Sequence, residues 1–540
     1  MNTIVSPTAL PDATAAHRPR LDHKPGKGTW AVFVLLLLVG LGYTAYSIST
    51  DYAASGETAT SLWPFLLLGL ALLIALGFEF VNGFHDTANA VATVIYTNSL
   101  PPQLAVVWSG VFNFLGVLVS SGAVAFGIIS LLPVELILQV GSQAGFAMVF
   151  ALLIAAIIWN LGTWYFGLPN SSSHTLIGSI IGVGLMNQIM AGPSGTSGVD
   201  WSQATGIGRA LLFSPLIGFV LSALLLLLSK ALIKAPQLYT APKGKEPPPF
   251  WIRGLLVLTC TGVSFAHGSN DGQKGMGLIM LILIGTVPTA FALNRAVTPD
   301  QTQVFVAVSH QASDVLSHYA PAGAPASVDA RKEVTDFVRT REIAPVTISA
   351  LQALSGSIAQ EVAKFGEFSN VPQGQISNVR NDMYLTSEAL RLMNKSGQPA
   401  FEGADKDVLK TYSRQLDNAT KFIPTWVKVA VALALGLGTM VGWKRIVVTV
   451  GEKIGKDHLT YAQGASAELV AMTTIGAADM FGLPVSTTHV LSSGVAGTMA
   501  ANGSGLQWET IRNMIMAWVL TLPASIILSG ALFFLFRNVF

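Results

Sequence analysis

Two short acidic motifs stand inside stretches of sequence that are otherwise apolar. Residues 83–90 read GFHDTANA and residues 268–275 read GSNDGQKG, and each motif follows an apolar run. A charged side chain at membrane depth costs several kcal/mol, so such a residue usually faces a cavity or a partner. Because Asp86 and Asp271 hold equivalent positions in the two motifs, they favour a functional pair over two acids that only tie helices together.

A second pair of motifs carries neutral hydrogen-bond donors. FGLPNSSSHTLIG at 166–178 is matched by FGLPVSTTHVLSS at 481–493. Proline suits the first turn of a helix, and the N–H groups of a helix N-terminus attract anions. The pattern favours an oxyanion site over ordinary helix caps. The donors are Ser171, Ser172, Ser173, Ser486, Thr487 and Thr488. His174 and His489 follow them, and the residues leave open whether they carry protons or are buried, hydrogen-bonded histidines.

The two pairs of motifs indicate an internal duplication. The first pair is offset by 268 − 83 = 185 residues and the second by 482 − 167 = 315. The offsets differ by 130, close to the length of the polar segment 294–424, which holds 13 of the 31 Lys/Arg and 14 of the 29 Asp/Glu. Removing this segment puts both pairs in one register. We therefore expect 294–424 to be a helical insertion outside the bilayer.

Glycines precede both acids. Gly83 and Gly268 can each break a helix, and a break exposes N–H and C=O groups that attract anions and cations. Close packing of helices through glycine is the alternative. Since both glycines lie beside polar residues, we expect broken helices here.

The composition predicts an all-α polytopic membrane protein. The chain is 51% hydrophobic and 11% charged, whereas soluble domains carry about 25% charged residues. Alternating segments of the kind found in membrane β-barrels are absent from the sequence. The single cysteine, Cys260, permits no intrachain disulfide. We expect about 10–12 transmembrane segments, with the clearest spans near 29–50, 62–82, 103–132, 144–166, 207–233, 251–266, 276–293, 425–443, 461–480 and 508–536.

Basic residues predict the orientation of these spans. They cluster before residue 29, at 230–253 and at 444–456, and such clusters face the cytoplasm. The first copy of the acidic motif then follows a span that starts outside, and the second a span that starts inside. The repeats are therefore expected to be inverted, as in many secondary transporters, which bind substrate near the midplane at the repeat interface.

The expected organisation follows from these patterns. The apolar stretch 29–50 exceeds the 7–15 residues of a signal-peptide core, which favours a retained extra helix with a cytoplasmic N-terminus. The expected parts are a polar tail at 1–28, the extra helix at 29–50, a first repeat at 62–233, an inverted second repeat at 251–293 and 425–536, and the outer insertion at 294–424.

The chain resembles the inorganic phosphate transporter (PiT) family. The resemblance rests on NGFHDTANAVATVIYT (82–97), AHGSNDGQKG (266–275), GLPNSSSHTLIG and GLPVSTTHVLSSGVAG. It spans 62–293 and 425–535, and the stretch AIIWNLGTWYFGLPNSSSHTLIG (156–178) is most similar to the bacterial low-affinity members. The resemblance implies ion-coupled phosphate symport by alternating access in a bacterial inner membrane. It assigns to the substrate and ion region the two Ser/Thr tracts together with Asp86, Thr87, Asn89, Asn270 and Asp271.

Two departures from the sodium-coupled members suggest the coupling ion. Those members have Asn before and three residues after the acid in both repeats; here His85 and Lys274 replace one Asn each. Our hypothesis is that Lys274 supplies a fixed cation where sodium would sit and that His85 with Asp86 handles a proton. The alternative for Lys274 is snorkelling to an interface. Glu468 is a further candidate for the ion path, and Glu79 a weaker one.

Other functions stay open at this point. Similar bacterial members accept neutral metal–phosphate complexes, which would make a divalent ion a co-substrate. A sodium-coupled phosphate symporter and a sulfate permease of the same fold are alternatives, and so is a phosphate-sensing channel or receptor. Ionised aspartates favour phosphate because sulfate has no proton to donate to them. The sequence shows no Walker loop, no metal-ligand cluster and no enzyme signature. We expect a lipid-embedded transporter without cofactor or nucleic-acid partner, compatible with a homodimer.

Overall fold

The computed structural model describes residues 19, 21, 26–56, 63–86, 88–192, 198–242, 244, 246–321 and 329–539, with the backbone alone for 63, 64, 86, 88 and 89. Across these residues the secondary structure is helical, apart from an isolated bridge between Gly455 and Leu506. Eight of the described helices are long and apolar enough to cross a membrane, or nine if a bent pair counts as one span. The expected all-α polytopic fold is confirmed.

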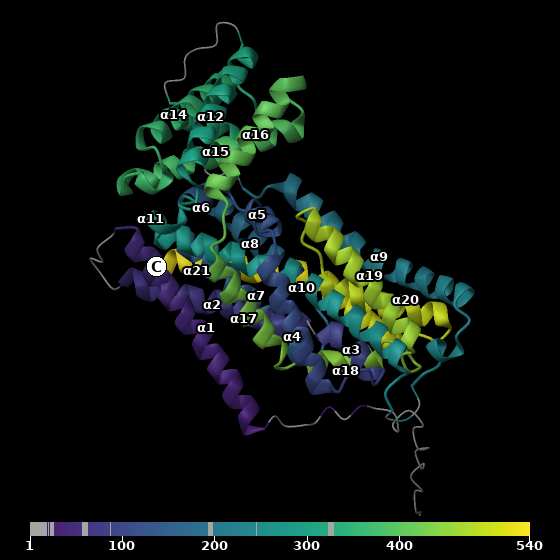
Figure 1. Cartoon of the computed structure of the whole chain (residues 1–540). Helices are drawn as coiled ribbons and strands as arrows, with labels where there is room; N and C mark the ends of the chain where they lie inside the picture. Colours follow the sequence, from purple (N-terminus) through teal and green to yellow (C-terminus); the bar gives the residue numbers. More distant parts are fainter. Residues whose placement is uncertain are drawn as a thin grey trace, which may run out of the picture.

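In the described residues before 233, the first half of the bundle contains nine α-helices, which can be followed in Figure 1. They are α1 (Lys27–Ala54), α2 (Trp63–Asp86), α3 (Ala88–Tyr96), α4 (Pro102–Val119), α5 (Ala123–Ile129), α6 (Val134–Leu138), α7 (Gln143–Tyr165), α8 (Ser172–Ala191) and α9 (Trp201–Leu232). The expected span 103–132 is therefore shorter than predicted, because α4 ends at Val119 and the extended Ser120 turns the chain into α5.

The second half is interrupted by a helical lobe. Its bundle helices are α10 (Phe250–Thr286), α11 (Pro288–Phe291), α17 (Thr425–Thr439), α18 (Lys444–Val448), α19 (Tyr461–Met480), α20 (Thr487–Asn502) and α21 (Trp508–Val539). The lobe, at one end of the bundle in Figure 1, comprises α12 (Pro299–Tyr319), α13 (Ala330–Thr340), α14 (Thr347–Phe365), α15 (Gln373–Ser396) and α16 (Gly403–Thr420). The chain bends by 71° between α16 and α17 where it re-enters the bundle.

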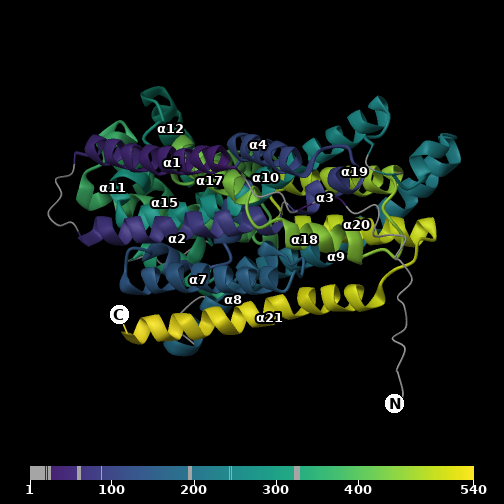
Figure 2. The same ribbon diagram turned by 90° about the horizontal axis from the view of Figure 1, so that it is seen from below.

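Equivalent helices of the two halves each pack on a helix of the opposite half. Helix α9 packs along α20, and its counterpart α21 packs along α8 (Figure 2). In the same way α10 packs on α4, while α2 packs on α17. This reciprocal pattern is what a duplicated architecture produces. The sidedness of the termini and of the lobe stays a prediction from the basic residues.

The predicted helix break at Gly268 is wrong. Helix α10 is continuous for 37 residues, so it joins the expected span 251–266 to the part of the span 276–293 that precedes Val287. A Cβ atom at Gly268 would lie 2.7 Å from the Cα of Asn113 on α4. At the equivalent Gly83 a Cβ would lie 3.1 Å from the Cα of Gly438 on α17, and α2 continues to Asp86. Both glycines allow helices of the two halves to cross closely, which was the alternative interpretation.

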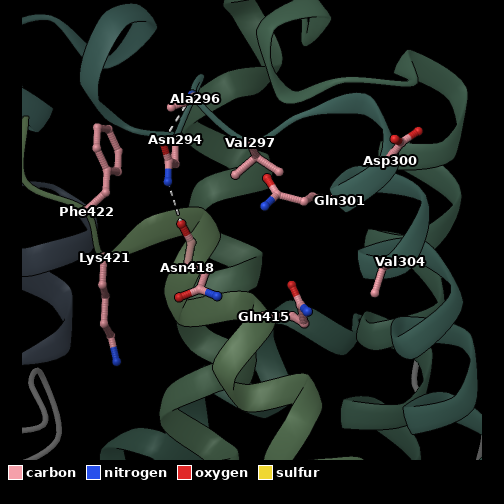
Figure 3. A pocket seen from close by; sticks show the side chains of 10 residues that line it. All are labelled: Asn294, Ala296, Val297, Asp300, Gln301, Val304, Gln415, Asn418, Lys421 and Phe422. Carbon is pink, nitrogen blue, oxygen red and sulfur yellow. Dashed lines mark hydrogen bonds between the residues drawn. The ribbon is translucent and has the colours of Figure 1, made fainter.

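A cavity lies at the junction of the lobe and the bundle (Figure 3). It has a volume of about 500 Å³. Asn294 Nδ2 donates to the backbone oxygen of Asn418 at 2.9 Å, which ties the entry of the lobe to its exit. The lining consists of Asn294, Ala296, Val297, Asp300, Gln301, Val304, Gln415, Asn418, Lys421 and Phe422. It includes none of the site residues predicted from the sequence.

Candidate functional site

The two Ser/Thr tracts meet in the middle of the bundle. Ser171 caps α8, with the His174 N–H donating to its Oγ at 3.2 Å, and Ser486 caps α20 in the same way at 3.1 Å to the His489 N–H. Ser173 Oγ donates to the carbonyl of Val485 at 2.6 Å. The rings of His174 and His489 are 4.7 Å apart.

The two helices therefore begin at one point and lie on opposite sides of it (Figure 2). Each N-terminus carries partial positive charge, so the meeting point favours an anion. Thr487 and Thr488, the first residues of α20, are 5% and 0% exposed. The inverted relation of the halves, expected from the basic clusters, accounts for two helix N-termini that converge.

A charged cluster from α10 lies against the start of α8. Lys274 Nζ is 2.8 Å from Asp271 Oδ2. Ser172 Oγ donates to the same carboxylate oxygen at 3.4 Å and accepts from Lys274 Nζ at 3.2 Å. The three side chains belong to residues that are at most 1% exposed. Asp271 Oδ1 has no hydrogen-bond partner among the described residues, so it is a free acceptor beside two donors.

Lys274 does not reach an interface. The snorkelling alternative is wrong, because the residue is 1% exposed and its ammonium group is paired with Asp271 three residues earlier on the same helix. A buried ammonium group needs such a partner, since water is not there to solvate it.

His267 was missed as a site residue. Its Nε2 is 3.4 Å from Asp271 Oδ2, and its Nδ1 is 2.7 Å from Asn113 Oδ1 on α4, which fixes the plane of the ring. The signal was present in the sequence, since residues four apart share one face of a helix.

Asp479, at the end of α19, was also missed. Its two carboxylate oxygens accept from Ser269 Oγ and from Gln273 Nε2, each at 2.6 Å. These bonds join α19 to α10 through Ser269 and Gln273, whereas Ser172 of α8 contacts α10 through Asp271 and Lys274. Asp479 has no acidic counterpart in the other copy, so the duplication gave no reason to single it out.

Other predicted residues lie elsewhere or cannot be placed. His85 Nε2 is 3.2 Å from Thr163 Oγ1 on α7. Glu468, fully buried on α19, accepts hydrogen bonds from the hydroxyls of Thr93 and Thr259 in a cluster of its own. Asn270 Nδ2 donates to the carbonyl of Leu483 at 3.1 Å, before α20. Thr87 and the side chains of Asp86 and Asn89 lie outside the described residues.

Metal-ligating side chains do not gather in the part of the chain that the structure describes. There, no three His, Cys, Asp or Glu side chains are placed to hold a metal ion together. The groups at this site that can bind a ligand include hydroxyls, helix N-termini, the ammonium group of Lys274 and the buried carboxylate of Asp271.

Comparisons with known proteins show the family of the chain. The model of the phosphate transporter family matches residues 82–529. The low-affinity inorganic phosphate transporter PitA of Escherichia coli (strain K12) is 45% identical over 486 residues, covering 87% of this chain and 96% of that protein. PitB of the same strain is 42% identical over 501 residues with the same coverage.

More distant relatives cover the chain to a similar extent. A probable low-affinity inorganic phosphate transporter of Bacillus subtilis (strain 168) is 28% identical, covering 88% of this chain and 99% of that protein. A solved structure described as the sodium-dependent phosphate transporter has a TM-score of 0.48 and 18% identity, covering 88% of this chain and 100% of its own. The family match and the identity to PitA and PitB confirm the expected resemblance: this multi-pass membrane protein, a transporter and not an enzyme, belongs to the phosphate transporter family.

Proposed function

We propose that this chain is a low-affinity transporter of inorganic phosphate in a bacterial inner membrane, and that it couples phosphate uptake to protons by alternating access. The observation that carries the proposal is the contact of Asp271, Lys274 and Ser172 at the point where α8 begins. The relatives named above as phosphate transporters support the choice of substrate.

The donors and acceptors complement a phosphate ion. The oxyanion accepts from the N–H groups and hydroxyls at the starts of α8 and α20 and from Lys274. Asp271 Oδ1 accepts the hydrogen bond of a phosphate O–H, which a sulfate ion cannot donate. We assign substrate binding to the two tracts with Asp86, Thr87, Asn89, Asn270 and Asp271, all named from the sequence motifs.

The fixed ammonium group supports proton coupling. Lys274 places one positive charge at the carboxylate without any bound ion. Sodium would have to share this carboxylate with the ammonium group, which like-charge repulsion disfavours. Protons therefore remain as the coupling ion, and a divalent metal that travels as a neutral phosphate complex fits the same balance of charge.

Transport into proteoliposomes tests the proposal. We expect ³²P-phosphate to accumulate when a pH gradient, acidic outside, is imposed and not when a sodium gradient alone is imposed. Excess sulfate should compete poorly. Accumulation driven by sodium alone would contradict proton coupling, and equal competition by sulfate would contradict the substrate. Repeating the assay with and without Mg²⁺ separates free phosphate from the metal complex.

A further inference from the structure

Glu79 on α2, a weaker candidate for the ion path from the sequence, is a buried carboxyl group that the proposed function does not use. The residue is 0% exposed. Asn82 Nδ2 donates to its Oε2 at 3.3 Å, and Oε1 has no hydrogen-bond partner among the described residues. An ionised carboxylate in such a place is costly unless it is paired and fully hydrogen-bonded. One long hydrogen bond does not meet that need, so this geometry suits the protonated form.

The carboxyl group rests on α10 at Gly275, the last residue of the GSNDGQKG motif. A Cβ atom at Gly275 would lie 2.7 Å from Glu79 Cδ, so only glycine leaves room for the carboxyl group. The N–H of Gly275 also approaches the carboxyl group, but it is shared with the hydrogen-bond ladder of α10. This contact places Glu79 one residue from Lys274, and it interacts electrostatically with both Lys274 and Asp271.

The two copies of the repeat differ at these two positions. The position equivalent to Glu79 is 79 + 185 = 264, a serine, and the position equivalent to Lys274 is 274 − 185 = 89, an asparagine. Each half thus contributes one charge that the other half lacks, and the two are of opposite sign. The fold brings this unmatched acid and unmatched base together across the interface of α2 and α10.

We propose that Glu79 is the proton-carrying group of the symport and that Lys274 alternates between Asp271 and Glu79. When Glu79 is protonated, Lys274 pairs with Asp271, and the neutral pair admits phosphate. When the O–H bond of Glu79 breaks and its proton leaves to solvent, the carboxylate draws Lys274 away, and the bare Asp271 repels an anion. Proton and phosphate then favour each other's binding, which is the requirement for symport.

The charged groups that interact with Glu79 are the side chains of Asp271 and Lys274. Asp271 and Lys274 face it from α10. Of the other elements packed on α2, α7 carries no Asp, Glu, Lys, Arg or His, and α17 carries Lys428 near its start. The side chain of Asp86 lies outside the described residues. The remaining titratable residues on these elements are His85, Tyr96, Tyr165, Arg253, Cys260, His267 and Lys428. Lys428, near the start of α17, donates instead to the carbonyl of Ser120 at 2.6 Å.

Two transport modes of one variant test this inference, which rests on the proposed function. Glu79→Gln imitates the protonated acid, so we expect exchange of ³²P-phosphate between equal solutions to continue and to lose its dependence on pH. Accumulation should fail, whereas the wild type gains about tenfold for one proton per phosphate and one pH unit. Glu79→Asp should keep part of the accumulation, and the lobe variant Glu342→Gln should match the wild type.

Several outcomes would overturn the assignment. Accumulation by Glu79→Gln at the wild-type level would do so, and loss of exchange in both Glu79 variants would assign the residue to binding or structure. A wild type driven by sodium alone would refute the proposed coupling whatever the variants do. If the variants fail to fold, dicyclohexylcarbodiimide, which modifies protonated buried carboxyls, provides a second measurement on the wild type. Modification of Glu79 should fall as pH rises, and its absence at every pH would refute a protonated Glu79.

Discussion

Lys274 changes what the site can do. Without it, two helix N-termini and a set of hydroxyls would face one buried carboxylate. With it, the carboxylate carries its own counter-ion at 2.8 Å, and both are shielded from water. The stability of each charge depends on the other, because either one left alone in this interior is uncompensated. Binding and stability therefore respond differently when the charges are removed singly or together.

Asp271→Asn should lower phosphate uptake by roughly thirtyfold or more, since truncating one partner of a buried charge pair costs about 2–5 kcal/mol. The asparagine keeps the shape but leaves the ammonium group of Lys274 unpaired. Initial rates of ³²P uptake in proteoliposomes measure the effect, with the exposed lobe variant Asp314→Asn as control. Uptake within about twofold of the wild type would remove Asp271 from the site.

The double variant Asp271→Asn with Lys274→Gln should regain stability but not transport. Removing both charges leaves no uncompensated group, so most of the destabilisation of each single variant should disappear. Thermal unfolding in detergent and uptake rates, measured on all four proteins of the cycle, separate the two effects. Additive losses of stability would show that the two charges do not depend on each other.

At the scale of elements, packing rather than local sequence decides the path of α10. The glycine and the polar residues of AHGSNDGQKG suggested a break, yet each polar side chain finds a partner across a helix crossing, so the helix stays intact. The partners are on α4, α8 and α19, far away in sequence, and a local pattern does not contain them. What the sequence did predict well was a feature repeated in both copies: a helix N-terminus at each Ser/Thr tract. The serine caps, which were the alternative interpretation, and the contact between the tracts appear only in the structure.

Gly268→Ala should destabilise the protein by about 1–3 kcal/mol, the usual cost of overpacking. The added methyl group would lie 2.7 Å from the Cα of Asn113 and force α4 and α10 apart. Gly254→Ala is the matched control on the same helix, because a Cβ there has no neighbour within 4 Å. It should be neutral or stabilising by up to about 1 kcal/mol. Similar melting temperatures for the two variants in detergent would refute a close crossing at Gly268.

At the scale of the whole molecule, the lobe is tied to the transport bundle by a network of charges. Asp200, which caps α9, is 2.9 Å from Arg391 of α15 and 3.6 Å from Arg341. Arg391 also pairs with Glu388 at 2.5 Å. Because α9 packs along α20, the network connects the lobe to a helix that begins at the candidate site. The sequence motifs did not predict this charge network, because none of its four residues belongs to a motif that is repeated in both halves.

The same network makes the attachment of the lobe dependent on pH. Burial alone would raise the pKa of the Asp200 carboxyl, but hydrogen bonds from the Gln203 N–H and from Arg391, together with Arg341, hold this pKa below its ordinary value. A lowered pKa in the folded state stabilises the fold at neutral pH, and this stabilisation is lost as the pH falls through it, below about pH 4.

Arg391→Ala should therefore loosen the lobe by roughly 1–3 kcal/mol at neutral pH, less than the loss of a fully buried pair, because the arginine is partly exposed and Arg341 remains near Asp200. Hydrogen exchange of α15 measures the loosening directly. The difference from the wild type should shrink below about pH 4, where Asp200 takes up its proton in both proteins. Arg339→Ala, which removes a surface pair with Asp336, is the matched control and should change exchange little. Equal protection of α15 in the wild type and Arg391→Ala at neutral pH would mean that apolar contacts alone hold the lobe in place.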